Sequence, residues 1–186
     1  MFPRNCSSDT SATERDSESS GYPRVVGTYT RGLPGPHLLV TGGVHGNEPD
    51  GVHAVRQVIA RLEERGTQLR GTLTGVAANR GGLARGARFI TRDLNRRWLL
   101  DEMIQLLRRD PASDEGEDRE QRELLHLLAP LLAAAREPLI FLDLHSTSGE
   151  GAPFACMADV IRNRKIAFAL GVPVVLGLEE VIDGSM

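Results

Sequence analysis

Residues 37–48 read HLLVTGGVHGNE, and they decide the fold because a run of strand length passes directly into a glycine-rich turn. The apolar and β-branched residues at 37–41 predict a strand. Beyond the turn, apolar residues recur at helical spacing from Val52 to Leu62, and Gly66 supplies a stop. A strand, a tight turn and a helix in this order are one unit of an alternating α/β fold.

The same alternation continues along the chain. Further strands are predicted at 25–29, 71–78, 138–144 and 172–178. Further helices are predicted at 98–107, 120–135 and 159–170. We expect an arginine- and glycine-rich loop up to Arg97 and a solvated acidic connection at 110–118. The fold class predicted is therefore α/β, with a mostly parallel or mixed central sheet flanked by helices.

Length and composition favour one globular domain. The chain has 186 residues, of which 40% are hydrophobic, which is enough for one sizeable core. Residues 1–22 are polar and are predicted to form a flexible tail, followed by the domain at 23–186. Cys6 and Cys156 are too few and too far apart for a disulfide framework or a cysteine-based zinc site.

The overall charge offers no general attraction for polyanions. With a formal net charge of -3 and a pI near 6.0, neither nucleic acid nor an anionic membrane surface is an expected partner. The sequence contains no secretory leader pattern and no apolar run approaching the roughly 18 residues that a spanning helix needs. A cytoplasmic location is the default expectation.

Two histidines and a glutamate are candidate zinc ligands. His45 and Glu48 lie three residues apart in the glycine-rich turn, which lets the backbone aim both side chains at one point. His145 follows the continuous apolar run at 138–144, so we expect it at the carboxyl end of a central strand, where ligands of open α/β sheets usually bind. Hydrolytic zinc commonly takes three such ligands and keeps a position for water. The sequence thus predicts one zinc ion per chain.

Asp143 and the segment 88–97 supply further candidate residues for the same site. Asp143 is two positions before His145, on the same side of an extended chain, where it could hold the imidazole of a ligand. Asn95 and Arg96 offer an amide and a guanidinium fork for a carboxylate. We therefore expect a small anionic substrate.

Each motif also has another interpretation. The glycine-rich turn could cradle a phosphate, but no Lys-Ser or Lys-Thr pair follows as a P-loop requires. Seen singly, His145 could be a hydrogen-bonded strand-end residue, Asp93 a helix cap and Arg96 a surface charge. Their joint occurrence favours a functional site. His37, His53 and His126 fit no such pattern and are assigned structural roles.

Three motifs together resemble one family. They are GGVHGNE at 42–48, RFITRDLNR at 88–96 and DLHST at 143–147. In order and spacing they resemble the succinylglutamate desuccinylase and aspartoacylase family of the zinc carboxypeptidase-like superfamily. The resemblance implies the fold of that superfamily and hydrolysis of the amide bond of an N-acyl amino acid.

The resemblance also assigns roles to residues. It implies that His45, Glu48 and His145 hold zinc and that Asn95 and Arg96 bind the substrate carboxylate. Arg88 matches the arginine that polarises the scissile carbonyl and stabilises the oxyanion.

One departure from the family concerns the general base. The family's base is a glutamate in a segment beyond the third zinc ligand that this chain does not contain. Glu179 and Glu180 match an earlier segment, so the base is unassigned. We expect a truncated catalytic domain that binds zinc and hydrolyses its substrate poorly, with an uncovered sheet edge that favours self-association.

Two alternatives stay open at this point. A metallocarboxypeptidase would use Asn95 and Arg96 for the carboxylate of a C-terminal residue. A non-catalytic metal- or anion-binding module is the second alternative, because the base is absent.

Overall fold

The computed structural model describes residues 21–134, 136–147, 149–178 and 184–186. The predicted flexible tail therefore lies almost wholly outside the described residues, as do Glu179 and Glu180.

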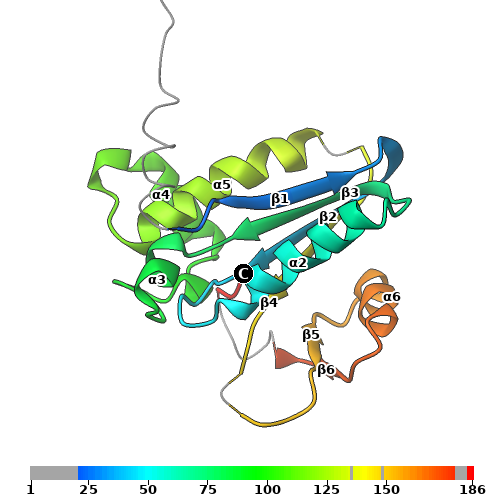
Figure 1. Cartoon of the computed structure of the whole chain (residues 1–186). Helices are drawn as coiled ribbons and strands as arrows, with labels where there is room; N and C mark the ends of the chain where they lie inside the picture. The colour runs from blue at the N-terminus through cyan, green and yellow to red at the C-terminus, as the bar shows by residue number, and fades with distance from the viewer. Residues whose placement is uncertain (1–20, 135, 148, 179–183) are drawn as a thin grey trace, which may run out of the picture.

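A four-stranded mixed sheet forms the centre of the molecule (Figure 1). It contains β1 (Val25–Thr30), β2 (Leu33–Gly42), β3 (Arg70–Ala77) and β4 (Leu139–Leu144), in the order β1-β3-β2-β4. β2 runs parallel to β3 and β4, whereas β1 is antiparallel to β3. The register pairs Gly42 with Leu144, so the carboxyl ends of β2 and β4 lie side by side. The predicted α/β class with a mixed central sheet is confirmed.

Helices cover both faces of this sheet, and successive side chains of β2 point into two separate cores. Leu39 packs with Val76 and with Leu124 of α5 (Glu117–Ala134). Val40, on the opposite face, packs with Val55 of α2 (Asp50–Glu64). Leu39 is fully buried and Val40 is 5% exposed, as expected of a strand covered on both sides.

The predicted loop before Arg97 contains a short helix. α3 (Arg80–Arg85) begins at Asn79, whose side-chain oxygen accepts a hydrogen bond from the N–H of Gly82 at 2.8 Å. It ends at Gly86, which has a φ of 59°. The prediction was wrong because the glycines of this stretch disfavour a helix, although the Asn cap and Gly stop were visible in the sequence.

The acidic connection is also different from its prediction. After α4 (Leu100–Arg108) and a short 3-10 turn, η2 (Pro111–Ser113), helix α5 begins at Glu117 rather than at residue 120. Asp114, Glu117 and Asp118 are buried, with 3%, 1% and 7% exposure. They are not solvated, because arginines and backbone N–H groups from elsewhere in the chain satisfy them.

β4 was expected to be a central strand. In the described part of the chain it pairs only with β2 and lies at an edge of the sheet, and Phe141 in it is 39% exposed. The apolar run at 138–144 predicts burial on both faces, but burial depends on which strands pair beside it, and periodicity carries no information about that.

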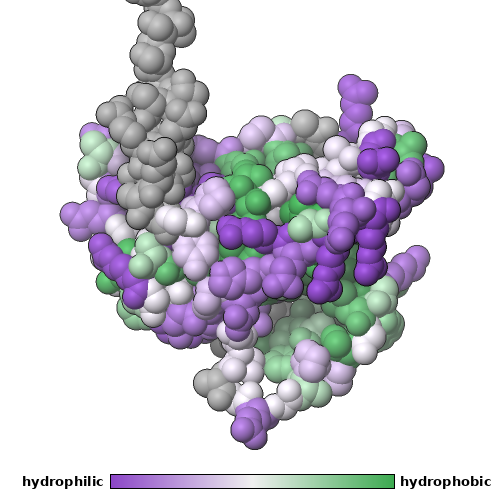
Figure 2. Space-filling view, viewed as in Figure 1, coloured by the Kyte–Doolittle hydropathy of each residue, from purple (hydrophilic) through white to green (hydrophobic). Residues whose placement is uncertain are grey.

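A second, smaller unit follows β4. β5 (Ala155–Met157) and β6 (Val174–Leu176) form a parallel pair linked by α6 (Ile161–Ala169). The helix and the second strand were predicted, with longer bounds, and β5 was not. Figure 2 shows hydrophobic surface over this unit, at the lower right, where Ile161 is 77% and Phe168 66% exposed. Within the described ranges, no helix is both long and apolar enough to cross a bilayer.

Candidate metal and substrate site

The turn after β2 places His45 and Glu48 at the carboxyl ends of the strands. Gly43 has a φ of 68°, a conformation that residues with a side chain rarely adopt. Gly46 packs so closely on α3 that a Cβ there would lie 2.0 Å from the carbonyl carbon of Gly82. The two glycines therefore serve the turn for different reasons, one through its backbone angle and one through close approach.

The Glu48 carboxylate lies between two imidazoles. Its Oε1 is 2.9 Å from Nδ1 of His45, and its Oε2 is 3.1 Å from Nδ1 of His145. The two rings have centroids 5.1 Å apart, and one donor atom from each of the three residues lies within 4.8 Å of the others. The N–H of Ser146 also donates to Oε2 at 3.1 Å. The three ligands predicted from the sequence thus converge on one point.

Each imidazole has a second carboxylate on its outer nitrogen. Nε2 of His45 is 3.1 Å from Oδ1 of Asp93, and Nε2 of His145 is 2.6 Å from Oδ2 of Asp143. The contact predicted for Asp143 is therefore present, and its other oxygen accepts from the hydroxyl of Thr41 at 2.6 Å. A carboxylate on the outer nitrogen fixes a ligand ring and its tautomer. Both inner Nδ1 atoms are left facing Glu48.

These contacts shift the ionisation of the surrounding groups. The hydrogen bond with Asp143 raises the pKa of His145 above its usual value, against the effect of burial, and the charge of Glu48 adds to it. Burial alone would raise the pKa of Asp93, but the N–H of Asn95, His45 and Arg88 together lower it.

Asp93 is the residue of this site that sequence reasoning missed. The sequence placed Asp93 in a motif interpreted as functional but indicated no contact for it beyond a possible helix cap, and it does cap η1 (Leu94–Arg96) by accepting from the N–H of Asn95 at 3.0 Å. The same oxygen contacts His45, across 48 positions of sequence. Local spacing gives no sign of such a pairing, although the position of Asp93 beside Asn95 in a polar motif was a signal that it could be functional.

Arg88 lies beside the cluster formed by His45, Glu48 and His145. Its Nη2 donates to Oδ2 of Asp93 at 3.1 Å, and its Nη1 is 3.8 Å from Oε1 of Glu48. The side chain is 46% exposed, so the guanidinium is held by carboxylates on one side and is accessible on the other.

Asn95 and Arg96 follow Asp93 in the chain and lie in η1. The side-chain oxygen of Asn95 accepts from the N–H of Met186 at 2.9 Å. Because an N–H can only donate, this contact assigns the oxygen to Met186 and leaves the amide NH₂ to face another acceptor. Arg96 is exposed, and its Nη1 donates to the carbonyl of Asn95 at 2.7 Å. Arg88 is thus brought onto the cluster, whereas Arg96 is not.

The donor set fits a zinc ion. Two imidazole nitrogens and one carboxylate oxygen are the ligands of many hydrolytic zinc sites, and they are gathered here with their second contacts already in place. Two of the histidines assigned structural roles contact other groups: Nε2 of His37 is 2.9 Å from the Thr74 hydroxyl, and His53 stacks on Tyr22.

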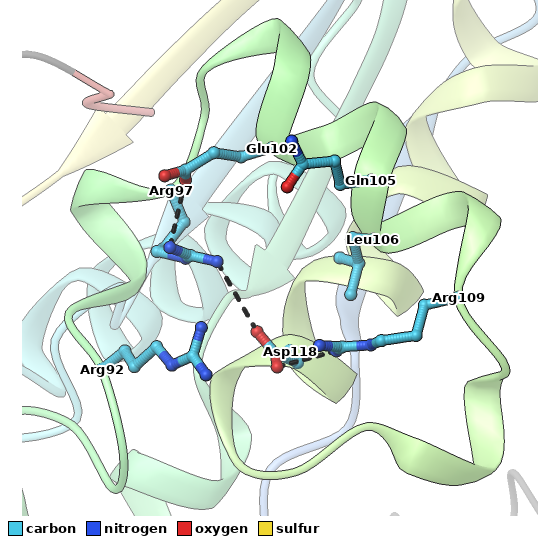
Figure 3. Close-up of a pocket in the computed structure, with 7 residues that line it drawn as sticks. All are labelled: Arg92, Arg97, Glu102, Gln105, Leu106, Arg109 and Asp118. Carbon is cyan, nitrogen blue, oxygen red and sulfur yellow. Dashed lines mark hydrogen bonds and ion pairs between the residues drawn. The ribbon is translucent and has the colours of Figure 1, made fainter.

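A small cavity of about 190 Å³ opens elsewhere, and it shares no lining residue with the cluster (Figure 3). It is lined by Arg92, Arg97, Glu102, Gln105, Leu106, Arg109 and Asp118.

Solved structures share this architecture. The structure of a metallo-carboxypeptidase from Burkholderia cenocepacia superposes with a TM-score of 0.52 at 15% identity, covering 90% of this chain and 53% of that one. The succinylglutamate desuccinylase from Chromobacterium violaceum gives a TM-score of 0.61 at 23% identity, with 84% and 48% covered. At these identities the likeness shows the fold, which is that of the zinc carboxypeptidase-like α/β proteins.

The family is more specific than the fold. The family model described as succinylglutamate desuccinylase/aspartoacylase catalytic domain matches residues 34–181, and the chain belongs to this family. Murine aminoacylase 3 is 29% identical, with a TM-score of 0.58, and the alignment covers 77% of this chain and 48% of that one. The chain thus spans about half the length of these solved relatives. No sequence among the curated proteins matches it significantly.

Proposed function

We propose that this chain carries the zinc-binding half of a hydrolase that cleaves the amide bond of an N-acyl amino acid. The observation that carries the proposal is the Glu48 carboxylate between the Nδ1 atoms of His45 and His145. A bound zinc ion would lower the pKa of a water molecule toward neutrality and polarise the amide carbonyl. Membership of the desuccinylase and aspartoacylase family supports an N-acyl amino acid as substrate.

Three residues of this chain would act on the substrate. Arg88, exposed on one side and next to Glu48, would donate to the carbonyl oxygen as negative charge develops on it. Asn95 and Arg96 would bind the carboxylate of the amino acid, with the NH₂ of Asn95 left available by its contact to Met186. Such a pair selects substrates that carry a free carboxylate.

The proton acceptor is proposed to lie outside the described residues. Glu48 is itself a proposed zinc ligand, and the carboxylates beside it, Asp93 and Asp143, each contact the outer nitrogen of a ligand imidazole. We assign these three carboxylates to holding the zinc site rather than to accepting a proton. We therefore expect the 186-residue chain to bind zinc and substrate and to turn substrate over slowly.

A metallocarboxypeptidase is the second candidate. The superposition with the Burkholderia cenocepacia metallo-carboxypeptidase favours it on fold, and Asn95 and Arg96 would serve a C-terminal carboxylate equally well. A non-catalytic metal-binding module is the third, and the engaged carboxylates favour it.

A substrate panel with the zinc-loaded chain separates these proposals. Binding is measured by calorimetry and amino acid release by chromatography, using N-succinylglutamate, N-acetylaspartate and a dipeptide with a free carboxylate. We expect an N-acyl amino acid to bind best, and Arg88→Ala to reduce its slow hydrolysis at least tenfold with zinc content unchanged. Preference for the dipeptide would favour the carboxypeptidase, and no binding of any of the three would favour the module.

A further inference from the structure

Glu117, the first residue of α5, is a buried carboxylate with every contact satisfied. It is 1% exposed. Its Oε1 accepts from the N–H of Ile90 at 2.6 Å and from Nδ2 of Asn79 at 3.1 Å. Its Oε2 accepts from the N–H and the hydroxyl of Thr91, both at 2.8 Å, and from the N–H of Arg92 at 3.0 Å. Three consecutive backbone N–H groups therefore converge on one carboxylate.

The backbone that Glu117 holds joins two residues of the candidate site. Residues 90–92 lie between Arg88 and Asp93. Asp93 contacts both Nε2 of His45 and Nη2 of Arg88. Residues 90–92 form no strand or helix of their own, and their three backbone N–H groups all donate to Glu117, which ties this segment to α5.

The neighbouring residues of α5 contact the other end of the same loop. Asp118 lies 4.0 Å from Nη2 of Arg97 and 2.7 Å from Nη2 of Arg109, as Figure 3 shows. Arg97 directly follows η1, which carries Asn95. Gln121 of α5 also donates to the carbonyl of Arg97. Helix α5 thus contacts the loop before Asp93 through Glu117 and the residue after η1 through Gln121 and, at a longer distance, Asp118.

The chemistry of these contacts requires a carboxylate at position 117. A carboxylate can accept hydrogen bonds at both oxygens, whereas a glutamine side chain has one oxygen and would turn its NH₂ toward N–H donors. Burial would raise the pKa of Glu117, but the N–H groups of Arg92, Ile90 and Thr91 lower it to about 2. Glu117 is therefore charged at neutral pH and carries no proton in a reaction.

We propose that Glu117 is a positioning residue of the site, because by holding residues 90–92 it sets the places of Arg88 beside the substrate carbonyl and of Asp93 against His45. This inference rests on the proposed function. It predicts that loss of the Glu117 carboxylate loosens the substrate side of the site while His45, Glu48 and His145 still bind zinc.

Three variants of the full chain test it. Glu117→Gln removes the charge at constant size, Glu117→Asp keeps a carboxylate on a shorter stem, and Glu115→Gln makes the same charge change at an exposed position of the same segment. Circular dichroism establishes that each variant is folded. The readouts are amide hydrogen exchange at 90–92, zinc content, and affinity for N-succinylglutamate and N-acetylaspartate by calorimetry.

We expect Glu117→Gln to speed exchange at 90–92 at least tenfold and to weaken binding of the preferred N-acyl amino acid at least tenfold, with zinc content unchanged. Glu117→Asp should recover part of both effects, and Glu115→Gln should match the parent. Parent-like exchange and affinity in Glu117→Gln would overturn the inference, as would loss of the zinc itself, because the ligands would then have been lost together with the substrate side.

Failure of the proposed function gives a different pattern. If the parent chain binds neither N-acyl amino acid, the proposed function is overturned. The amide hydrogen exchange at 90–92 and the imidazole NMR signals of His45 then test the positioning role of Glu117 without any substrate. Unchanged exchange and unchanged His45 signals in Glu117→Gln would overturn it whatever the parent binds.

Discussion

Oδ2 of Asp143 lies 2.6 Å from Nε2 of His145, two residues further along the chain. The other oxygen of Asp143 accepts from the Thr41 hydroxyl on the neighbouring strand, so the carboxylate is itself held in place. The result is a histidine whose Nδ1 is aimed at Glu48. A ligand that is oriented in advance loses less entropy on binding.

Asp143→Asn should weaken zinc binding without abolishing it. The amide keeps the size of the side chain but loses the charge that orients His145 and makes its imidazole a better ligand, and such changes typically cost about 10–100-fold in metal affinity. Competition with a chromophoric chelator measures the affinity. Asp159→Asn, which removes an exposed carboxylate paired with Arg164, is the matched control. Equal affinities of Asp143→Asn and the parent would show that Asp143 has no such role.

Gly46→Ala should lower the stability of the fold and displace the turn that carries His45 and Glu48. A Cβ at Gly46 would lie 2.0 Å from the carbonyl carbon of Gly82 and 2.4 Å from the carbonyl oxygen of Ala87, so backbone must move. Overpacking of this kind typically costs about 1–3 kcal/mol.

Urea unfolding measures the effect of Gly46→Ala. Gly151→Ala is the control, since a Cβ at Gly151 meets nothing within 4 Å. A parent-like midpoint for Gly46→Ala would mean that the turn is looser than its contacts indicate.

The stability of the fold should depend on pH through Glu117. Its pKa is lowered from 4.5 to about 2 in the folded chain, so its contribution is complete above about pH 4.5 and is lost as the pH falls toward 2. A shift of this size corresponds to roughly 3 kcal/mol over the whole range.

Unfolding free energies measured by urea at several pH values between 5 and 3 test this dependence. They should fall more steeply in the parent and in Glu115→Gln than in Glu117→Gln. Equal slopes in the three proteins would contradict the low pKa.

The parts of the fold and site that could be predicted from sequence are those with local signals. The apolar run and glycine-rich turn around His45 and Glu48 predict a strand, a turn and a helix, and β2 and α2 have that order. His145 lies at the same end of the sheet as His45 because its strand is parallel to β2, and an alternating α/β pattern predicts parallel strands.

The parts that could not be predicted depend on pairings between distant residues. Asp93 contacts His45 across 48 positions, and Glu117 holds residues 90–92 from 25 to 27 positions away. In sequence, Glu117 belongs to an acidic stretch of the kind that is usually solvated, and only the tertiary fold places N–H groups around it. The edge position of β4 likewise depends on which strands pair with it.

Zinc stoichiometry of the purified chain, measured by elemental analysis beside His45→Ala and His145→Ala, tests the central claim most directly. The two imidazoles flank Glu48 at 2.9 and 3.1 Å, so removing either leaves an incomplete ligand set. We predict near one zinc per chain in the parent and little in both variants. A folded parent without zinc, or variants that keep the full content, would contradict the assignment of His45, Glu48 and His145 as a metal centre.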